Sequence, residues 1–394
     1  MKQQGMTLVE LMVAMVIGLG ITLAISSVLI ASENHKRTTT STNDAQQTGS
    51  YGFHALDRAL RGAGSAIAES AFPTDVGVLG CHLNAGTIFP RANPFPTPFA
   101  AFLGGAPTTL KVAPVLIGKD QSQDGVSDVV MVMSGSGSAG GVSRQITGGG
   151  NATSAILDNT VGFAHDDLLL VSQGGVADCL LEQVDTFTTA TLNLAGTYYT
   201  ATGGTTSMNT LAGSTSSFVT PLGNADANNV QFTLFGIDSN HTLYSYDLLR
   251  NLQLVGGAGG DVAQAIADGV VQMNAIYGID TNGDGKQDSW AGPGEIGAWD
   301  INTVMASPTK MKQIVSVRIA LVVRGEYYDT KRDAAGNPIA VTQPTLTIFN
   351  GLTDTVTAVS LQQTINLNAT DQQFRYRVFE FTVPLRNMLL LAGA

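Results

Sequence analysis

The sequence predicts an α+β protein in which one long N-terminal helix is followed by a large β-rich globular head. Residues 6–62 carry helical patterning, and from residue 63 the chain turns into short apolar runs separated by turn residues. The 45 glycines and the low charged share of 13% are typical of a chain rich in strands and loops. We therefore expect a leader over residues 1–5, the helix over 6–62 and the head over 63–394.

The first half of the predicted helix is apolar enough to cross a bilayer. From Leu11 to Ser32 no residue is ionisable, and at about 1.5 Å per residue this run covers the ~30 Å hydrocarbon core. A secretory signal peptide has a shorter apolar core and places its cleavage site after that core. Here the small residue suited to processing, Gly5, precedes the run, so we expect the apolar helix to stay in the mature protein.

Glu10 is the only charge in the hydrophobic run that follows Gly5. A carboxylate inside an apolar helix costs about 2.5–3.5 kcal/mol on insertion scales unless it reaches the interface or a partner. The glycine, the glutamate five residues later and the uncharged run resemble the class III signal of type IV pilins and pseudopilins. This resemblance implies that a prepilin peptidase cuts after Gly5 and methylates the new N-terminus, Met6. It also implies that Glu10 pairs with the N-terminal amine of a neighbouring subunit; an ordinary signal anchor is the alternative.

The second half of the helix has a polar surface interrupted by a few large apolar residues. These residues recur at near-helical spacing: Tyr51, Phe53, Leu56 and Leu60. The spacing predicts that this half packs on the head. The β-branched run Thr38–Thr42 is poor in helix formers, so we expect a kink or a frayed stretch there.

Apolar runs bounded by turn residues predict the strands of the head. The clearest are 124–133, 166–172, 311–326 and 373–388. Residues 229–249 predict a hairpin with its turn at Asp238–Asn240. Two stretches rich in Gly, Ser, Thr and Asn, 134–160 and 195–229, predict loops or irregular β-structure.

The two cysteines, Cys81 and Cys179, are expected to form one disulfide if the head lies outside the cytoplasmic membrane. The bridge would close a loop of about 98 residues. The chain-entropy description assigns such a bridge about 4–5 kcal/mol as an upper value. Two buried free thiols are the alternative.

Residues 280–288 have the spacing of the first part of a calcium loop. Oxygen-bearing side chains occupy positions one, three, five and nine: Asp280, Asn282, Asp284 and Asp288. Lys286, at position seven, would offer its backbone carbonyl. Position twelve is Ala291 rather than a bidentate glutamate, and Glu295 or Asp300 could take that role. Carboxylates without His or Cys favour Ca²⁺ over a transition metal; a turn that binds nothing is the alternative.

Charge and motifs argue against an enzyme and against direct nucleic-acid binding. The formal net charge of −11 disfavours non-specific binding to DNA. The five histidines show no HExxH or zinc-type spacing, and the chain has no GxSxG nucleophile motif. We therefore predict a non-enzymatic protein.

Three phrases narrow the resemblance to the PilW-like minor pilins, which are large non-structural subunits of type IV pilus assembly. They are LDRALRGAG at 56–64, ADGVVQMNAIYGIDTNGDG at 267–285 and FTVPLRNM at 381–388. The resemblance implies a subunit of an assembly-initiation complex at the pilus tip, acting in fimbrial functions such as twitching motility. It implies three kinds of partner: the prepilin peptidase, other minor pilins and the major pilin.

The same resemblance implies a single-pass inner-membrane protein with a periplasmic head before assembly, and a place at the pilus tip on the cell surface afterwards. Two other functions stay open. A tip adhesin would use the polar loops of the middle region, 65–230, for cell adhesion. A type II secretion pseudopilin would share the signal and a calcium-bearing head, but the large tip pseudopilin of that system typically lacks the glutamate that stands here at Glu10.

Overall fold

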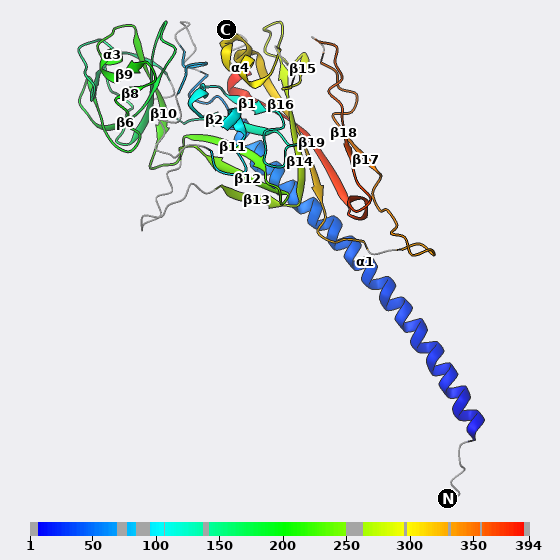
Figure 1. Ribbon diagram of the computed structural model, residues 1–394. Coiled ribbons are helices and arrows are strands. Elements are labelled where there is room, and N and C mark those ends of the chain that lie inside the picture. The colour runs from blue at the N-terminus through cyan, green and yellow to red at the C-terminus, as the bar shows by residue number, and fades with distance from the viewer. Residues whose placement is uncertain are drawn as a thin grey trace, which may run out of the picture.

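The computed structural model places a β-rich head on the C-terminal half of one long helix (Figure 1). The described residues are 7–68, 77–83, 95–105, 107–136, 142–249, 263–294, 298–329, 332–354 and 357–389. The predicted α+β class is confirmed.

Helix α1 spans Leu8–Gly62, which is 55 residues or about 80 Å. The expected kink at Thr38–Thr42 is wrong, because the helix runs through this stretch without a break. The hydroxyls of Thr39 and Thr42 donate to the backbone carbonyls of His35 and Thr38, at 3.0 and 2.9 Å. These bonds satisfy the polar side chains within the helix.

The last third of the chain forms an antiparallel sheet of order β15-β14-β16-β19 that packs along α1. Its strands are β14 Val270–Ile279, β15 Ser289–Ala291, β16 Ile314–Arg324 and β19 Tyr376–Pro384. Two short helices, α4 Ile301–Ala306 and α5 Pro308–Gln313, precede β16, and α6 Arg386–Leu389 follows β19. The predicted strand 311–326 therefore starts too early, because Pro308 at the first helical position and the Ser307 cap turn the preceding residues into α5.

A second antiparallel sheet has the order β1-β2-β11-β12-β13. Its strands are β1 Val115–Gly118, β2 Val129–Ser134, β11 Gln231–Ile237, β12 Thr242–Asp247 and β13 Gln264–Asp268. The predicted hairpin is confirmed as β11 and β12. Its turn is closed by Asp238, whose Oδ1 accepts from the N–H groups of Asn240 and Thr242 at 3.0 and 2.8 Å.

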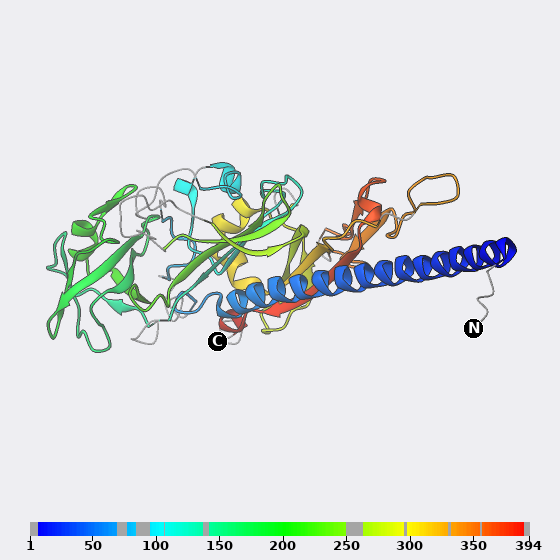
Figure 2. The same ribbon diagram turned by 90° about the horizontal axis from the view of Figure 1, so that it is seen from below.

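The third sheet builds what we call the distal lobe, residues 142–224, with the order β3-β10-β5-β6-β7-β4. Its strands are β3 Arg144–Gln145, β4 Ser154–Ile156, β5 Asp167–Gln173, β6 Leu180–Phe187, β7 Thr191–Leu194 and β10 Ser217–Asn224. Small elements complete the fold: β8 Thr202–Gly203, β9 Thr206–Ser207, α3 Met208–Ala212, β17 Thr345–Ile348, β18 Gln363–Asn366 and the short 3₁₀ turns Phe102–Gly105, Pro107–Thr109 and Asp371–Gln373. Both views place the distal lobe at the end of the molecule opposite the start of α1 (Figure 1, Figure 2).

The second half of α1 is seated in the head through small and aliphatic residues. Its buried residues are Ser41, Ala45, Gly49, Gly52, Leu56 and Leu60. A Cβ on Gly49 would lie 2.1 Å from the ring of Phe379 on β19, so only glycine lets the helix approach this closely. Tyr51, expected in the packed face, is 62% exposed, whereas Leu56 and Leu60 are fully buried as expected.

The end of α1 is fixed by the end of the described chain. The amide of Asn387 donates to the carbonyls of Gly62 and Ala63 at 3.3 and 3.0 Å. These carbonyls are among the groups that a helix terminus leaves without partners inside the helix. The LRN phrase near the C-terminus thus caps the LRGAG phrase at the end of the helix.

Candidate assembly site

The first half of α1 extends away from the head as a bare apolar rod. Its large apolar side chains range from 47% exposed at Leu11 to 74% exposed at Leu8. Of the helices that the structure describes, only α1 is long and apolar enough to cross a membrane. An apolar surface of this size is incompatible with free exposure to water, so it requires lipid or other helices around it.

Glu10 lies in the first turn of this rod and closes a capping box with Thr7. The Glu10 Oε2 accepts from the Thr7 backbone N–H at 3.0 Å and from its hydroxyl at 2.9 Å. The Glu10 N–H donates to the Thr7 hydroxyl oxygen at 3.4 Å. In the single chain the carboxylate is therefore satisfied locally. Its predicted pairing with a neighbour's amine stays a prediction, and the predicted processing residues Gly5 and Met6 lie outside the described residues.

The Asp280 side chain organises the predicted calcium loop from within. It is 2% exposed, and its carboxylate accepts from the backbone N–H groups of Asn282, Gly283 and Gly285 at 3.1, 2.6 and 2.7 Å. Burial alone would raise the pKa of Asp280, but these donors outweigh it and hold the pKa below its usual value. The loop is thus shaped around a buried carboxylate.

The other predicted ligands are turned to backbone donors in the same way. Asp284 accepts from the N–H of Lys286 at 2.9 Å, and the Asp288 carboxylate accepts from the Thr281 N–H at 3.2 Å and from the Thr281 hydroxyl at 2.8 Å. Asp300 caps helix α4 instead of reaching the loop, and Glu295 lies outside the described residues. Within the described ranges, no group of three or more His, Cys, Asp or Glu side chains is placed to hold a metal ion. Calcium binding stays a prediction.

A second turn with the same spacing, Asp-x-Ser-x-Asp-Gly-x-x-Asp at 120–128, escaped the sequence analysis. Here Asp128 is 1% exposed, and it accepts from the N–H groups of Asp120 and Ala275 at 3.0 and 2.8 Å. Burial is the main cause that raises the pKa of Asp128 to about 7. This carboxyl joins the turn before β2 to strand β14, so the spacing also occurs where a carboxyl connects two sheets.

Cys81 and Cys179 form the predicted disulfide, with their Cα atoms 5.8 Å apart. The neighbouring residues also pair, with His82 Nδ1 2.7 Å from Asp178 Oδ1. The bridge fastens the segment after α1 to the distal lobe beside strand β6. It therefore links two parts of the head that are far apart in sequence.

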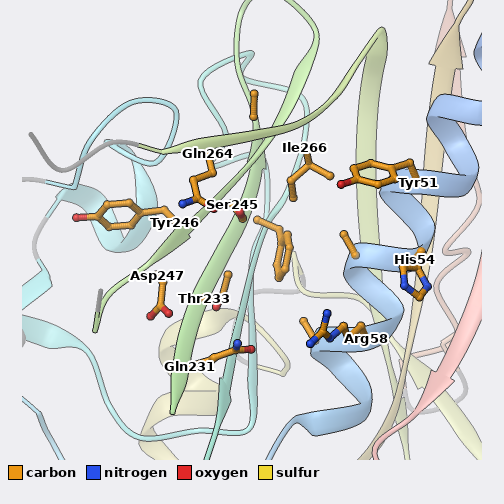
Figure 3. A pocket seen from close by; sticks show the side chains of 14 residues that line it. Tyr51, His54, Arg58, Gln231, Thr233, Ser245, Tyr246, Asp247, Gln264 and Ile266 are labelled. Atoms are coloured by element: carbon orange, nitrogen blue, oxygen red, sulfur yellow. The ribbon is translucent and has the colours of Figure 1, made fainter. Parts of the chain in front are cut away.

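A groove of about 450 Å³ lies between α1 and the strands β11, β12 and β13. In Figure 3, Tyr51 and Arg58 point from the helix toward Ile266 and Gln231 on the strands. Ala55 lines the same face of the helix, and its small side chain leaves the gap open. Polar groups around a partly apolar floor, in a space of this size, are typical of a site for a small polar ligand. No local sequence pattern predicts this groove, because residues from four separate elements line it.

These features are the ones that the N-terminal signal predicts for a pilin-type subunit: an apolar helix half, a glutamate in its first turn, and a β-rich head on its second half. Residues 1–19 match the family described as the prokaryotic N-terminal methylation motif. Residues 235–387 match PilW, the type IV pilus-assembly protein W family. The resemblance to PilW-like minor pilins is thus confirmed, and over these two segments the chain is similar to type IV pilus-related pilins.

The match to PilW covers the sheet that packs on α1 and leaves out the distal lobe. Both matching families point to a structural rather than an enzymatic protein, and to a context of other pilus components. The N-terminal signal and the apolar helix indicate a membrane-anchored pilin. Searches of curated proteins and of solved structures returned no match to the chain.

Proposed function

We propose that this protein is a minor pilin that helps to initiate the type IV pilus and remains at its tip. The observation that carries the proposal is the division of α1. Its first half is apolar, and the head buries none of its side chains. Its second half packs into the core of the head. A helix of this kind exchanges lipid for the helices of other subunits without unfolding anything.

Assembly requires that Glu10 exchange its partner as well. In the single chain its carboxylate accepts from Thr7. After the prepilin peptidase has cut behind Gly5, the amine of Met6 on one subunit meets Glu10 on its neighbour. An ion pair between them neutralises two charges that would otherwise be costly in apolar surroundings. The pair also fixes the axial register of the two helices. The neighbours are other minor pilins and the major pilin.

The distal lobe supports a place at the tip. It projects beyond the end of α1, on the side away from the membrane-spanning half (Figure 2). In a fibre of parallel helices, the lobe occupies the space into which the head of the next subunit would stack. Before assembly the head lies in the periplasm, with the distal lobe pointing away from the membrane. After assembly the head is carried to the cell surface at the end of the fibre.

Labelling the distal lobe tests this placement. An epitope inserted at Gly175, whose backbone is exposed at a turn with open space around it, leaves strands β5 and β6 intact. Gold-labelled antibody should decorate one end of sheared pili. Decoration at many positions along the shaft would contradict the tip placement.

The groove beside α1 favours a tip adhesin as the second candidate function. A polar ligand site on the head is not needed for starting a fibre, but it is what a receptor-binding subunit requires. Ala55→Trp fills the groove from the helix side. Adherence that falls while the number of pili stays constant supports the adhesin, and adherence that is unchanged excludes the groove as its receptor site.

We also propose that Ca²⁺ binds the loop 280–288. The support is its three carboxylates within nine residues, which repel one another unless a cation lies between them. Binding would require Asp284 and Asp288 to turn away from their present backbone donors. The ion would stabilise the loop between β14 and β15 in the sheet that carries α1.

A further inference from the structure

The base of the head faces the bilayer in which α1 is anchored. The level of the bilayer along α1 follows from the apolar segment. Leu11–Ile30 spans about 30 Å and fills the hydrocarbon core, and the headgroups extend about 5–8 Å beyond it on each side. Asn34 lies about 6 Å past Ile30, at the outer part of the headgroup layer.

Two tyrosines of the head lie at this level and directly beyond it, because the crevice that they line runs along α1 from Asn34 to Ser41. Tyr327 and Tyr328 line a narrow crevice with Asn34, Arg37 and Thr38 of α1. Their side chains are 43% and 37% exposed. Tyrosine is enriched at membrane interfaces, because its ring is apolar and its hydroxyl stays hydrated.

The chain beyond the tyrosines extends further toward the membrane. The orange loop before β17 projects from the head on the side of the bare half of α1 (Figure 1, Figure 2). Residues 332–340 are exposed throughout, and Ile339 presents 42% of its surface. We call Tyr327, Tyr328 and residues 332–340 the head base.

The head base is held in place against α1. Gly325 packs so closely on Ser41 that an added Cβ would lie 2.1 Å from the Ser41 hydroxyl. Arg375 reaches both Asp329 and the Thr38 hydroxyl, at 3.4 and 3.5 Å. Tyr328 also packs on Phe374 with ring centroids 5.4 Å apart.

The far end of the loop is tied as well. The N–H groups of Val341 and Thr342 donate to the carbonyl of Gln372, at 2.8 and 3.0 Å. Because both ends of the loop are fixed to the body of the head, its distance from the start of α1 is set by the fold.

The charges around the head base do not oppose contact with lipid. Among the described residues in and next to the head base, three exposed cations are matched by three exposed anions: Lys36, Arg37 and Arg332 against Glu33, Glu326 and Asp333. The whole chain, in contrast, carries a net charge of −11. The excess of negative charge that would repel anionic lipid therefore lies elsewhere on the head.

We propose that the head base rests in the headgroup region of the membrane before the subunit enters a fibre, with Tyr327, Tyr328 and Ile339 as its lipid contacts. The head base lies next to the membrane-spanning half of α1. The side chains that it offers to the lipid are aromatic and aliphatic. The contact fixes the angle between the head and the bilayer. It requires only a membrane-anchored chain, so its failure would leave the pilus role untouched.

Depth-dependent quenching in vesicles tests this contact. The full chain, with its disulfide intact, carries an environment-sensitive dye at Ile339→Cys, or at Val161→Cys as a control that is 76% exposed on the distal lobe. Lipids with a spin label near the headgroup serve as quenchers. The dye at position 339 should be quenched several-fold more than the dye at position 161. Equal quenching would overturn the proposal.

Two further comparisons decide which groups make the contact. The double variant Tyr327→Ser/Tyr328→Ser should reduce the quenching at position 339 at least twofold, and unchanged quenching would exclude the tyrosines. Vesicles of phosphatidylethanolamine with and without phosphatidylglycerol should give the same result at about 0.15 M and about 1 M salt. Quenching that needs the anionic lipid and disappears at high salt would replace the aromatic contact by electrostatic attraction.

Discussion

The two halves of α1 differ in what they contact, although they form one unbroken helix. The first half holds the most apolar residues of the chain, and none of its side chains is buried. The second half is polar overall, yet it enters the core through Leu56 and Leu60 and through the small residues Gly49 and Gly52. Apolar content therefore does not identify the part of a helix that packs on its own domain. Small residues that let the helix approach its neighbours closely identify that part.

Two truncations should separate the halves most clearly. Deletion of residues 1–32 should give a folded head, because none of the described residues that it removes, 7–32, is buried. Deletion of residues 1–62 should abolish cooperative folding, because it opens the core that Leu56 and Leu60 complete. Circular dichroism and thermal melts of both proteins provide the measurement. A cooperative melt of the shorter protein would show that α1 is not part of the core.

Point variants should show the same contrast with the chain length unchanged. Leu56→Ala and Leu60→Ala remove fully buried side chains and should each lower the free energy of unfolding by about 2–5 kcal/mol. Leu23→Ala, at a position that is 69% exposed on the first half, is the matched control and should leave the head unchanged. Denaturant unfolding in detergent measures all three. A similar loss for Leu23→Ala would mean that the first half does support the head.

The distal lobe offers a source of instability that is independent of α1. Burial raises the pKa of Glu182 on β6 from 4.5 to about 9, and its Oε1 has no hydrogen-bond partner. Between these values the unfolded chain loses this proton and the folded chain keeps it, so stability falls as pH rises. Glu182→Gln should remove a pH-dependent loss of up to about 4 kcal/mol between about pH 5 and pH 8. Parallel stability profiles of variant and parent would refute a neutral Glu182.

Calcium should have the smallest effect, and only on the head. If Ca²⁺ binds at 280–288, free ion at about ten times its Kd adds about 1.4 kcal/mol to the free energy of unfolding. The thermal midpoint should then rise by a few degrees, equally in the full chain and in the chain without residues 1–32. Asp284→Asn, at an exposed position, should remove the shift. No response of the parent to millimolar Ca²⁺ in calorimetry or melts would exclude the site.

The sequence predicted those elements whose signals are local. The apolar run of α1, the Asp238–Asn240 turn and the pair of cysteines each depend on a few neighbouring residues, and all three appear in the structure. The calcium spacing is also local, but its recurrence at 120–128 shows that the same pattern forms a turn around a buried carboxyl. A spacing alone does not separate the two uses.

Strand β10 shows why other parts could not be predicted. It lies in a stretch whose Gly, Ser and Thr content predicted loops, and it contains Pro221, which has no backbone N–H to donate to a neighbouring strand. Its pairing with β3 stops at Val219, so Pro221 faces no partner on that side, and a bulge between Pro221 and Gly223 absorbs the irregularity. The groove beside α1 depends likewise on contacts between distant elements, which no local pattern encodes.

The most direct test of the central claim is the number of pili sheared from cells that lack this protein and are complemented with variants. The account predicts that pili vanish without the protein and return with the parent chain and with Glu33→Ala, an exposed charge farther along the same helix. Glu10→Ala should fail to restore them, although its head is folded and present in the membrane. Pili as abundant with Glu10→Ala as with the parent would contradict a role in which Glu10 seats this subunit among its neighbours.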